Sequence, residues 1–146
     1  MKRKMLLLTM AVLPIFAGCG NSNANTLTCT RTRGDFTQSR IIEFNSDKTK
    51  VTRSAVEVTY DFTNVTDFSD YDGCDDASSC LKIAETSVDD CKNDDDFENC
   101  EIRERTSKKV VIRGYYKQEK ADDEFGEDDY AEIKDQLESY GYTCKE

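Results

Sequence analysis

The sequence predicts an α+β domain in which helices pack on one face of an antiparallel sheet, in the order β-β-β-α-β-β-α. Three observations lead to this prediction. Apolar and polar residues alternate through the first half of the chain, and from residue 77 the period lengthens to three or four residues. A hairpin pattern and a second helical stripe then close the chain. Six cysteines spread over these segments predict that disulfides staple the fold.

The first three strands are expected to form an antiparallel meander. Residues 27–32 are rich in threonine and alternate, and residues 39–44 place apolar side chains on one face. The clearest strand covers residues 56–62. Val51 falls on the opposite phase, which predicts a β-bulge near Ser54. The apolar face of the third strand consists of Val56, Val58, Tyr60 and Phe62.

A helix is expected at residues 77–91, after an aspartate-rich loop at residues 65–76. Asp75 and Asp76 stand where a helix N-cap and a negative charge favoured by the helix dipole belong. The apolar stripe of this helix consists of Ala77, Cys80, Leu81, Ala84, Val88 and Cys91.

The second half contains a hairpin and a closing helix. Residues 92–99 are acidic and expected to be exposed, while residues 100–106 and 109–116 are the arms of the hairpin. Residues 118–127 are expected to form a charged linker. The last helix is predicted at residues 128–140.

The end of the last helix carries its own signal. Gly141 fits the left-handed position that follows a helix, and Tyr142 can close a Schellman contact on Leu137, five residues earlier.

The first eighteen residues have the layout of a secretory signal peptide. Basic residues occupy positions 2–4, residues 5–17 are apolar and uncharged, and small residues lead to Cys19. An apolar stretch of about 13 residues is shorter than the ~20 that a membrane-spanning helix needs. We therefore expect residues 1–18 to be removed.

Phe16-Ala17-Gly18-Cys19 resembles the lipobox of bacterial lipoproteins, with Phe16 where that family usually has Leu. The resemblance implies cleavage before Cys19, a diacylglycerol on its sulfur, and further acylation, for example with palmitate. Residues 19–26 then form a flexible tether, and residues 27–146 form a single domain. The expected location is the extracytoplasmic face of the cell membrane, with membrane lipid as a partner through Cys19.

Cysteine parity supports the lipid assignment. The chain has seven cysteines, an odd number for a secreted protein. Lipid on Cys19 leaves six, which is even. The six disulfide candidates are Cys29, Cys74, Cys80, Cys91, Cys100 and Cys144.

Geometry narrows the pairings. Cys80 and Cys91 lie about 16 Å apart on one predicted helix, whereas the Cα atoms of a disulfide lie within ~7 Å. These two cysteines therefore do not bond to each other. Cys29 and Cys144 are expected to join the first strand to the end of the chain. The other four form either Cys74–Cys80 with Cys91–Cys100, which we favour because short loops close easily, or Cys74–Cys91 with Cys80–Cys100.

Composition excludes several classes of function. Without the three N-terminal basic residues, 17 Lys and Arg stand against 30 Asp and Glu, a formal net charge of −13, and such a surface repels nucleic acid. The chain has no histidine, which removes Ser-His-Asp catalysis and His-ligated metals. We therefore expect a protein that is not an enzyme and that has neither a cofactor nor a nucleic-acid partner.

Two groups of side chains remain as binding candidates. Acidic residues in segments 67–76 and 89–98 could hold Ca²⁺, which takes six to eight oxygen ligands, although a solvated charged surface is the favoured interpretation. Five tyrosines could form a sugar- or peptide-binding surface, although core packing is favoured. The candidate Ca²⁺ ligands are Asp70, Asp72, Asp94, Asp95, Asp96 and Glu98, and the tyrosines are Tyr115, Tyr116, Tyr130, Tyr140 and Tyr142.

Element order, length and lipobox together are similar to the YehR-like small bacterial lipoproteins, although six further cysteines are not part of that pattern. The resemblance adds no functional residue. We expect a membrane-anchored, non-catalytic binding or interaction module with an unidentified partner at the cell surface. Cation binding or sensing through the aspartate-rich segments is the alternative.

Overall fold

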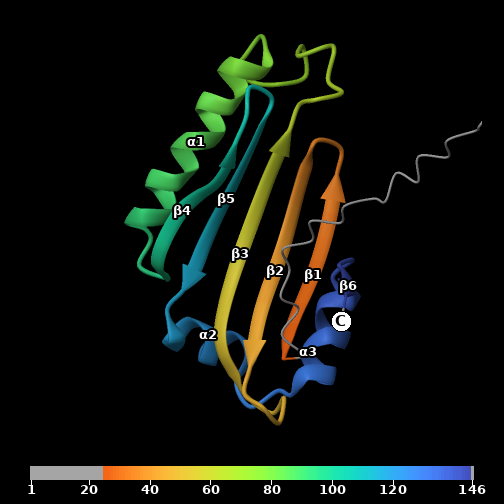
Figure 1. Ribbon diagram of the computed structural model, residues 1–146, viewed down its shortest axis with the longest axis vertical. Helices are drawn as coiled ribbons and strands as arrows, with labels where there is room; N and C mark the ends of the chain where they lie inside the picture. Colours follow the sequence, from red (N-terminus) through yellow and green to blue (C-terminus); the bar gives the residue numbers. More distant parts are fainter. Residues whose placement is uncertain (1–24, 146) are drawn as a thin grey trace, which may run out of the picture.

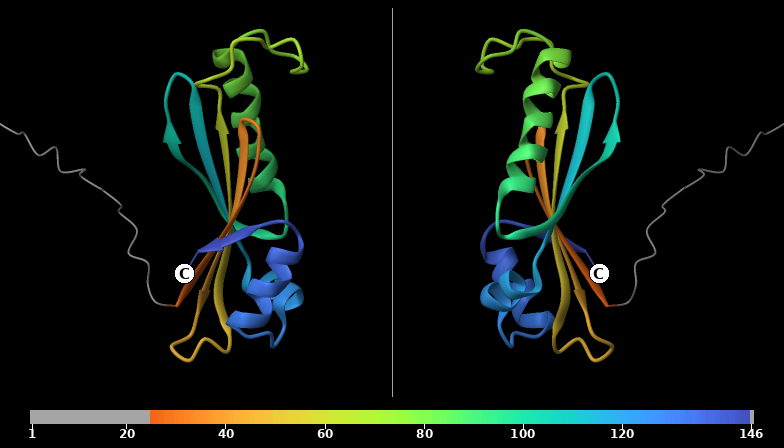
Figure 2. Two further views of the ribbon diagram at one scale, coloured as in Figure 1. Left: turned by 90° about the vertical axis from the view of Figure 1, so that its right-hand side faces the viewer. Right: turned by 90° about the vertical axis from the view of Figure 1, so that its left-hand side faces the viewer.

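The alternating segments of both halves come together in one antiparallel sheet of six strands, in the order β4-β5-β3-β2-β1-β6. This computed structural model describes residues 25–145, so the expected signal peptide and Cys19 lie outside the described residues. All three helices lie on the same side of the twisted sheet (Figures 1 and 2). The elements are β1 (Thr26–Arg33), β2 (Phe36–Phe44), β3 (Val51–Asp61), α1 (Ala77–Asn93), β4 (Phe97–Arg105), β5 (Lys109–Tyr116), α2 (Gln118–Phe125), α3 (Tyr130–Ser139) and β6 (Thr143–Lys145).

The predicted fold class is confirmed, and two elements add to the predicted order. The prediction of a linker at residues 118–127 is wrong, because most of this segment forms the helix α2. Ala121 and Phe125 lie four residues apart on one face of α2, and both are buried. Because six residues of this segment are charged, its sequence does not predict that Ala121 and Phe125 are buried. The second addition is β6, which pairs with the open edge of β1.

The meander of β1, β2 and β3 contains the expected bulge at a slightly different place. Glu43 lies opposite Arg53 and Phe44 lies opposite Val51, so the extra residue on β3 is Thr52, two positions before the predicted Ser54. The bulge turns Val51 onto the covered face of the sheet, where it is buried.

The middle of β3 is less covered than its sequence predicts. Val56 and Val58 are only partly buried, and neither belongs to a core cluster. Phe62 is buried just beyond the end of the strand. Val56 and Val58 therefore lie in the part of the sheet between the two cores that the helices cover.

The helix α1 begins where the sequence predicts. The side chain of Asp76 accepts a hydrogen bond from the backbone N–H of Ser79 at 2.7 Å, and Ser79 Oγ in turn accepts one from the N–H of Asp76. Four of the six residues of the predicted stripe are buried: Cys80, Leu81, Ala84 and Val88.

The predicted end of the last helix is also confirmed. Gly141 has φ +83°, the N–H of Tyr142 donates to the carbonyl of Leu137 at 3.2 Å, and the N–H of Gly141 donates to that of Glu138 at 3.0 Å. These two bonds define a Schellman motif. At its start, Asp129 caps α3 in a capping box with Glu132.

The covered face of the sheet holds two separate hydrophobic cores. One lies beneath α2 and α3 and includes Leu27, Ile42 and Phe125, while the other lies beneath α1 and includes Leu81 and Val110. Within the described part of the chain, no helix combines the length and apolar character needed to cross a bilayer.

The opposite face of the sheet is uncovered and largely polar. Its side chains pair with each other across strands, as in Thr30 with Ser39 at 3.0 Å between their hydroxyl oxygens. Glu57 accepts two hydrogen bonds from Arg113, at 2.8 and 2.5 Å. Because its polar groups find partners in neighbouring strands, this face needs no further layer.

Three disulfides link the six cysteines in the favoured pairing: Cys29–Cys144, Cys74–Cys80 and Cys91–Cys100. Cys29 and Cys144 are directly opposite each other in the pairing of β1 with β6. The other two disulfides fasten the start and the end of α1 to neighbouring segments.

We expect the disulfides to contribute unequally to stability. Cys29–Cys144 spans 115 residues and Cys74–Cys80 spans 6. In the chain-entropy model, replacing Cys29 and Cys144 together by Ala lowers the free energy of unfolding by about 5 kcal/mol, and replacing Cys74 and Cys80 lowers it by about 2 kcal/mol. Urea denaturation of the two double variants measures both values. Equal losses would contradict this ranking.

Candidate functional site

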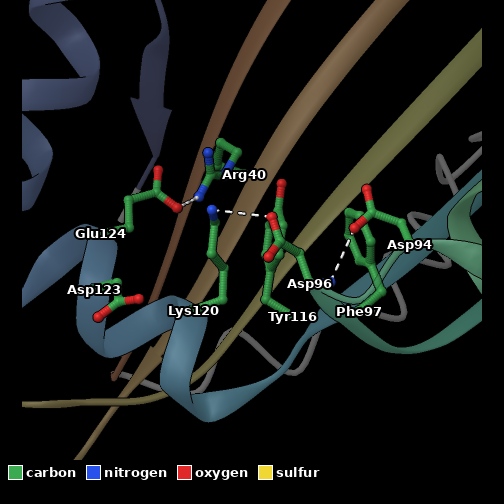
Figure 3. Close-up of a pocket in the computed structure, with 8 residues that line it drawn as sticks. All are labelled: Arg40, Asp94, Asp96, Phe97, Tyr116, Lys120, Asp123 and Glu124. Atoms are coloured by element: carbon green, nitrogen blue, oxygen red, sulfur yellow. Dashed lines mark hydrogen bonds and ion pairs between the residues drawn. The ribbon is translucent and has the colours of Figure 1, made fainter.

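Two adjoining hollows open between the two cores on the covered face. The first has a volume of about 520 Å³ and the second about 360 Å³, and both are lined by Arg40 and Glu124. We call them together the Arg40 cleft. The first hollow is drawn in Figure 3 and is also lined by Asp94, Asp96, Phe97, Tyr116, Lys120 and Asp123.

Arg40 forms the floor where the hollows meet. Its position on β2 follows from strand alternation, since it lies between Gln38 and Ile42 on the covered face. The side chain is only 11% exposed, and Nη2 donates a hydrogen bond to Glu124 Oε2 at 2.7 Å. The guanidinium carbon lies 5.3 Å from the ring centre of Tyr116 and 5.6 Å from that of Phe125. The guanidinium group of Arg40 therefore lies between the carboxylate of Glu124 and two aromatic rings.

The ion pair keeps Arg40 charged in this environment. Burial alone lowers the pKa of an arginine, but the hydrogen bond and the charge of Glu124 outweigh burial, so the pKa of Arg40 is raised above its ordinary value. Its Nε atom is buried and has no hydrogen-bond partner in the described residues.

The α1–β4 loop forms the wall opposite α2. Lys120 Nζ lies 2.9 Å from Asp96 Oδ2, and the backbone N–H of Lys117 donates to the carbonyl of Asp96 at 2.9 Å. Asp94 Oδ1 accepts a hydrogen bond from the backbone N–H of Asp96 at 2.9 Å, and this bond shapes the turn before β4. Figure 3 shows Lys120 reaching from α2 toward Asp96, and Glu124 reaching from the same helix toward Arg40.

Aromatic packing closes one side of the first hollow. Phe97 and Tyr116 are opposite each other on β4 and β5, with ring centres 4.5 Å apart and nearly parallel. Phe97 can lie this close because residue 114 is glycine. A Cβ on Gly114 would come within 2.8 Å of the Phe97 ring and 2.9 Å of Cys91 Sγ.

The second hollow lies beside α3. Tyr140 is 62% exposed at its border. Tyr142 donates from its hydroxyl to Gln38 Oε1 at 3.0 Å, and the Arg31 guanidinium lies 4.8 Å from the centre of its ring. Gln136 lines the same hollow, and its buried Oε1 atom has no partner among the described groups.

The first hollow carries more negative than positive charge. Four carboxylates and two cations line it, and two of the carboxylates are ion-paired with Arg40 and Lys120. An anionic ligand is therefore disfavoured in the first hollow, whereas Arg31 and Arg40 face Glu124 alone in the second.

The structure separates the two aspartate-rich segments. Asp94 and Asp96 line the cleft, Asp95 lines a separate hollow that shares Asp96 with it, and Glu98 is exposed on β4. The loop with Asp70 and Asp72 precedes the other end of α1, about 25 Å away along a helix of this length. Between residues 25 and 145, no group of three or more His, Cys, Asp or Glu side chains is placed to hold a metal.

The five tyrosines also separate. Tyr130 packs against Phe44 in the core, with ring centres 5.2 Å apart, whereas Tyr115 lies on the uncovered face with Arg53 at 4.0 Å from its ring centre. Only Tyr116, Tyr140 and Tyr142 border the cleft. Sequence analysis did not identify Arg40 as a site residue. The one sequence feature that points to it is its position on β2, where alternation places it on the same face as Gln38 and Ile42.

No protein-family model, no curated protein and no solved structure matches this chain. The resemblance to the YehR-like lipoproteins stays a prediction, and the cleft is interpreted from its own geometry.

The contact between Phe97 and Gly114 can be tested by substitution. Gly114→Ala is expected to lower the free energy of unfolding by about 1–3 kcal/mol, because the added methyl group overlaps the Phe97 ring. In the background of Phe97→Leu, where the ring is absent, the same substitution is expected to cost less. A double-mutant cycle followed by urea denaturation measures the difference. Additive losses would show that the ring is not the obstacle.

Stability is expected to fall at alkaline pH. Burial, opposed by the charge of Arg40 and assisted by that of Glu124, raises the pKa of Tyr116. A raised pKa in the fold favours the neutral phenol, so this contribution is complete below the ordinary tyrosine value of about 10 and is lost as the pH rises above it. Tyr116→Phe should reduce the loss of unfolding free energy between about pH 9 and about pH 11. Tyr140→Phe, at an exposed tyrosine, is the matched control, and identical profiles for wild type and Tyr116→Phe would refute the assignment.

Proposed function

We propose that this chain is a lipid-anchored, non-catalytic binding module on the extracytoplasmic face of a bacterial cell membrane, and that its partner enters the Arg40 cleft. The observation that carries the binding role is the cleft itself. A charged arginine is held at the junction of two hollows by an acid and two aromatic rings, where a closed core would have apolar side chains.

Cysteine usage supports the anchored, extracytoplasmic part of the proposal. The three disulfides engage all six cysteines of the described residues, which leaves the lipobox cysteine, Cys19, as the one available for lipid. Three disulfides in a domain of this size are typical of an oxidising compartment. Two or three acyl chains provide stable anchoring even for a chain with so acidic a surface.

The side chains of the cleft support binding rather than catalysis. Arg40 and Lys120 are ion-paired to carboxylates, Arg31 donates to Gln38 and lies against the Tyr142 ring, and the chain contains no histidine to act as a general base. The other lining groups include aromatic rings, an amide, hydroxyls and the carboxylates of Asp94 and Asp123, which orient a ligand through contacts and hydrogen bonds.

Anchoring can be tested by the intact mass of the protein isolated from bacterial membranes. We expect the mass of residues 19–146 plus diacylglycerol and further acyl chains, with six cysteines that do not react with a thiol reagent in the folded protein. Cys19→Ser should remove the acyl mass, and Ser22→Ala, in the tether, should retain it. An unacylated wild-type chain would overturn the anchoring.

A further inference from the structure

We infer that the Arg40 cleft recognises a short peptide by its two ends, with the carboxyl-terminal carboxylate bound by Arg31 in the second hollow and the amino-terminal ammonium group bound in the first. The two hollows carry opposite net charge, and such a peptide matches both. The inference rests on the proposed function for the role of the cleft, and it adds the chemical class of the ligand.

Arg31 presents to the second hollow a positive charge that no acid neutralises. Like Cys29 two residues earlier on β1, it lies on the covered face of the sheet. Its guanidinium donates to Gln38 Oε1 at 3.1 Å and to the carbonyl of Tyr140 at 3.4 Å, and it lies over the ring of Tyr142. These partners are uncharged, and no carboxylate of the described residues forms an ion pair with Arg31. The guanidinium is therefore held in place while its charge stays available to an anionic group.

The second hollow is net positive. Arg31 and Arg40 line it, and Glu124, which is bound to Arg40, is the one carboxylate among the described residues that line it. The two arginines occupy diagonal positions on β1 and β2, because Arg31 is opposite Gln38 and Arg40 is opposite Cys29. A carboxylate beside Arg31 offsets the excess positive charge and accepts charge-assisted hydrogen bonds from the guanidinium. This hollow therefore suits the negative end of a ligand.

The first hollow has the opposite charge. Two of its four carboxylates form the ion pairs with Arg40 and Lys120. The other two, Asp94 and Asp123, form no ion pair with a described residue. Figure 3 shows them on opposite walls of the hollow, Asp123 on α2 and Asp94 before β4. An ammonium group carries three hydrogen-bond donors and a positive charge, so it suits these free carboxylates.

The separation of the two charges favours a peptide. Of the two hollows, Arg31 lines only the second, whereas Asp94 and Asp123 line only the first. The ion pair between Arg40 and Glu124 stands between them. In a free amino acid or a zwitterionic lipid headgroup the opposite charges are a few atoms apart, whereas each residue of an extended peptide adds up to ~3.5 Å. A chain of several residues can therefore pass over the ion pair and reach both hollows.

Size and aromatic lining suit the middle of such a peptide. The volumes of the hollows, about 520 and 360 Å³, lie in the range of small-ligand sites. Tyr140 is 62% exposed beside the second hollow, and Tyr116 lines the first, where Phe97 supports its ring. Tyrosine rings pack against peptide groups and aliphatic side chains whatever the charge of the ends.

The test uses the full chain, extracted in an uncharged detergent, and isothermal titration calorimetry with tri-, tetra- and pentaalanine that have free ends. We expect at least one of these peptides to bind. For the tightest of them, amidation of the carboxyl end and acetylation of the amino end should each weaken binding about tenfold, the loss typical of one charge-assisted contact. Free alanine and phosphoethanolamine, whose opposite charges are close together, should bind more weakly than the peptide.

The carboxylate end is assigned by substitution of Arg31. Arg31→Met keeps much of the side-chain stem and removes its charge. It should weaken binding of the free peptide about tenfold and leave binding of the amidated peptide unchanged, because that peptide has already lost the contact. Arg33→Met, at an exposed arginine two residues further along β1, is the matched control and should leave both affinities unchanged.

The amino end is assigned in the same way. Asp94→Asn together with Asp123→Asn removes the two free carboxylates and keeps both ion pairs of the cleft. This double variant should weaken binding of the free peptide about tenfold and leave binding of the acetylated peptide unchanged. Asp89→Asn together with Asp135→Asn changes the net charge equally at exposed positions outside both hollows, and it should have no effect. Thermal melting of each variant confirms that it is folded.

Several results would overturn the inference. They are the absence of heat with all three peptides up to about 10 mM, equal affinity for the free, amidated and acetylated forms, an effect of Arg31→Met that persists with the amidated peptide, or tighter binding of phosphoethanolamine than of the peptides. The mass measurement on Cys19 is independent of these titrations. A lipidated chain that does not bind the peptides refutes only the ligand class, whereas a chain that binds them without lipid refutes only the anchor.

Discussion

Three short helices cover one face of a six-stranded sheet, and they do so in two separate places. The helix α1 packs on β4 and β5, while α3 packs on β1 and β6 and α2 on β3. Each place has its own hydrophobic core, and the Arg40 cleft opens between them. Arg40 lies in this gap, and its bond to Glu124 fastens α2 above the floor of the cleft. The Arg40–Glu124 ion pair thus joins β2 to α2 in the part of the sheet that lies between the two cores.

Most of the fold was predictable because its signals are local. Alternation defines the meander, the Asp76 cap and the three-to-four-residue stripe define α1, and Gly141 ends α3 where the left-handed conformation is needed. The helix α2 escaped prediction because its burial depends on two residues, Ala121 and Phe125, within a run of charges. The short strand β6 escaped for a related reason, since three residues form a strand only when β1 offers an edge and a disulfide partner.

The site was less predictable because its parts meet only after folding. Helix geometry excludes a bond between Cys80 and Cys91, and short loops favour the observed pairing over Cys74–Cys91 with Cys80–Cys100. The cleft instead joins Arg40 from β2, Tyr116 from β5, Glu124 from α2 and Gln136 from α3, which no spacing in the sequence connects. The aspartates near residue 95 were recognised as an acidic segment, but their contacts with other parts of the chain were not. Asp94 shapes a turn and Asp96 pairs with Lys120.

The bond between Cys29 and Cys144 also has a mechanical consequence. If a domain is held to a surface by its first residues, any drag on it pulls β1 lengthwise and tends to peel that strand away from β2. The load reaches the disulfide after the first three residues of β1, and from there it passes through sulfur into β6 and the end of α3. Under such a load, the first and last strands of the domain resist tension together.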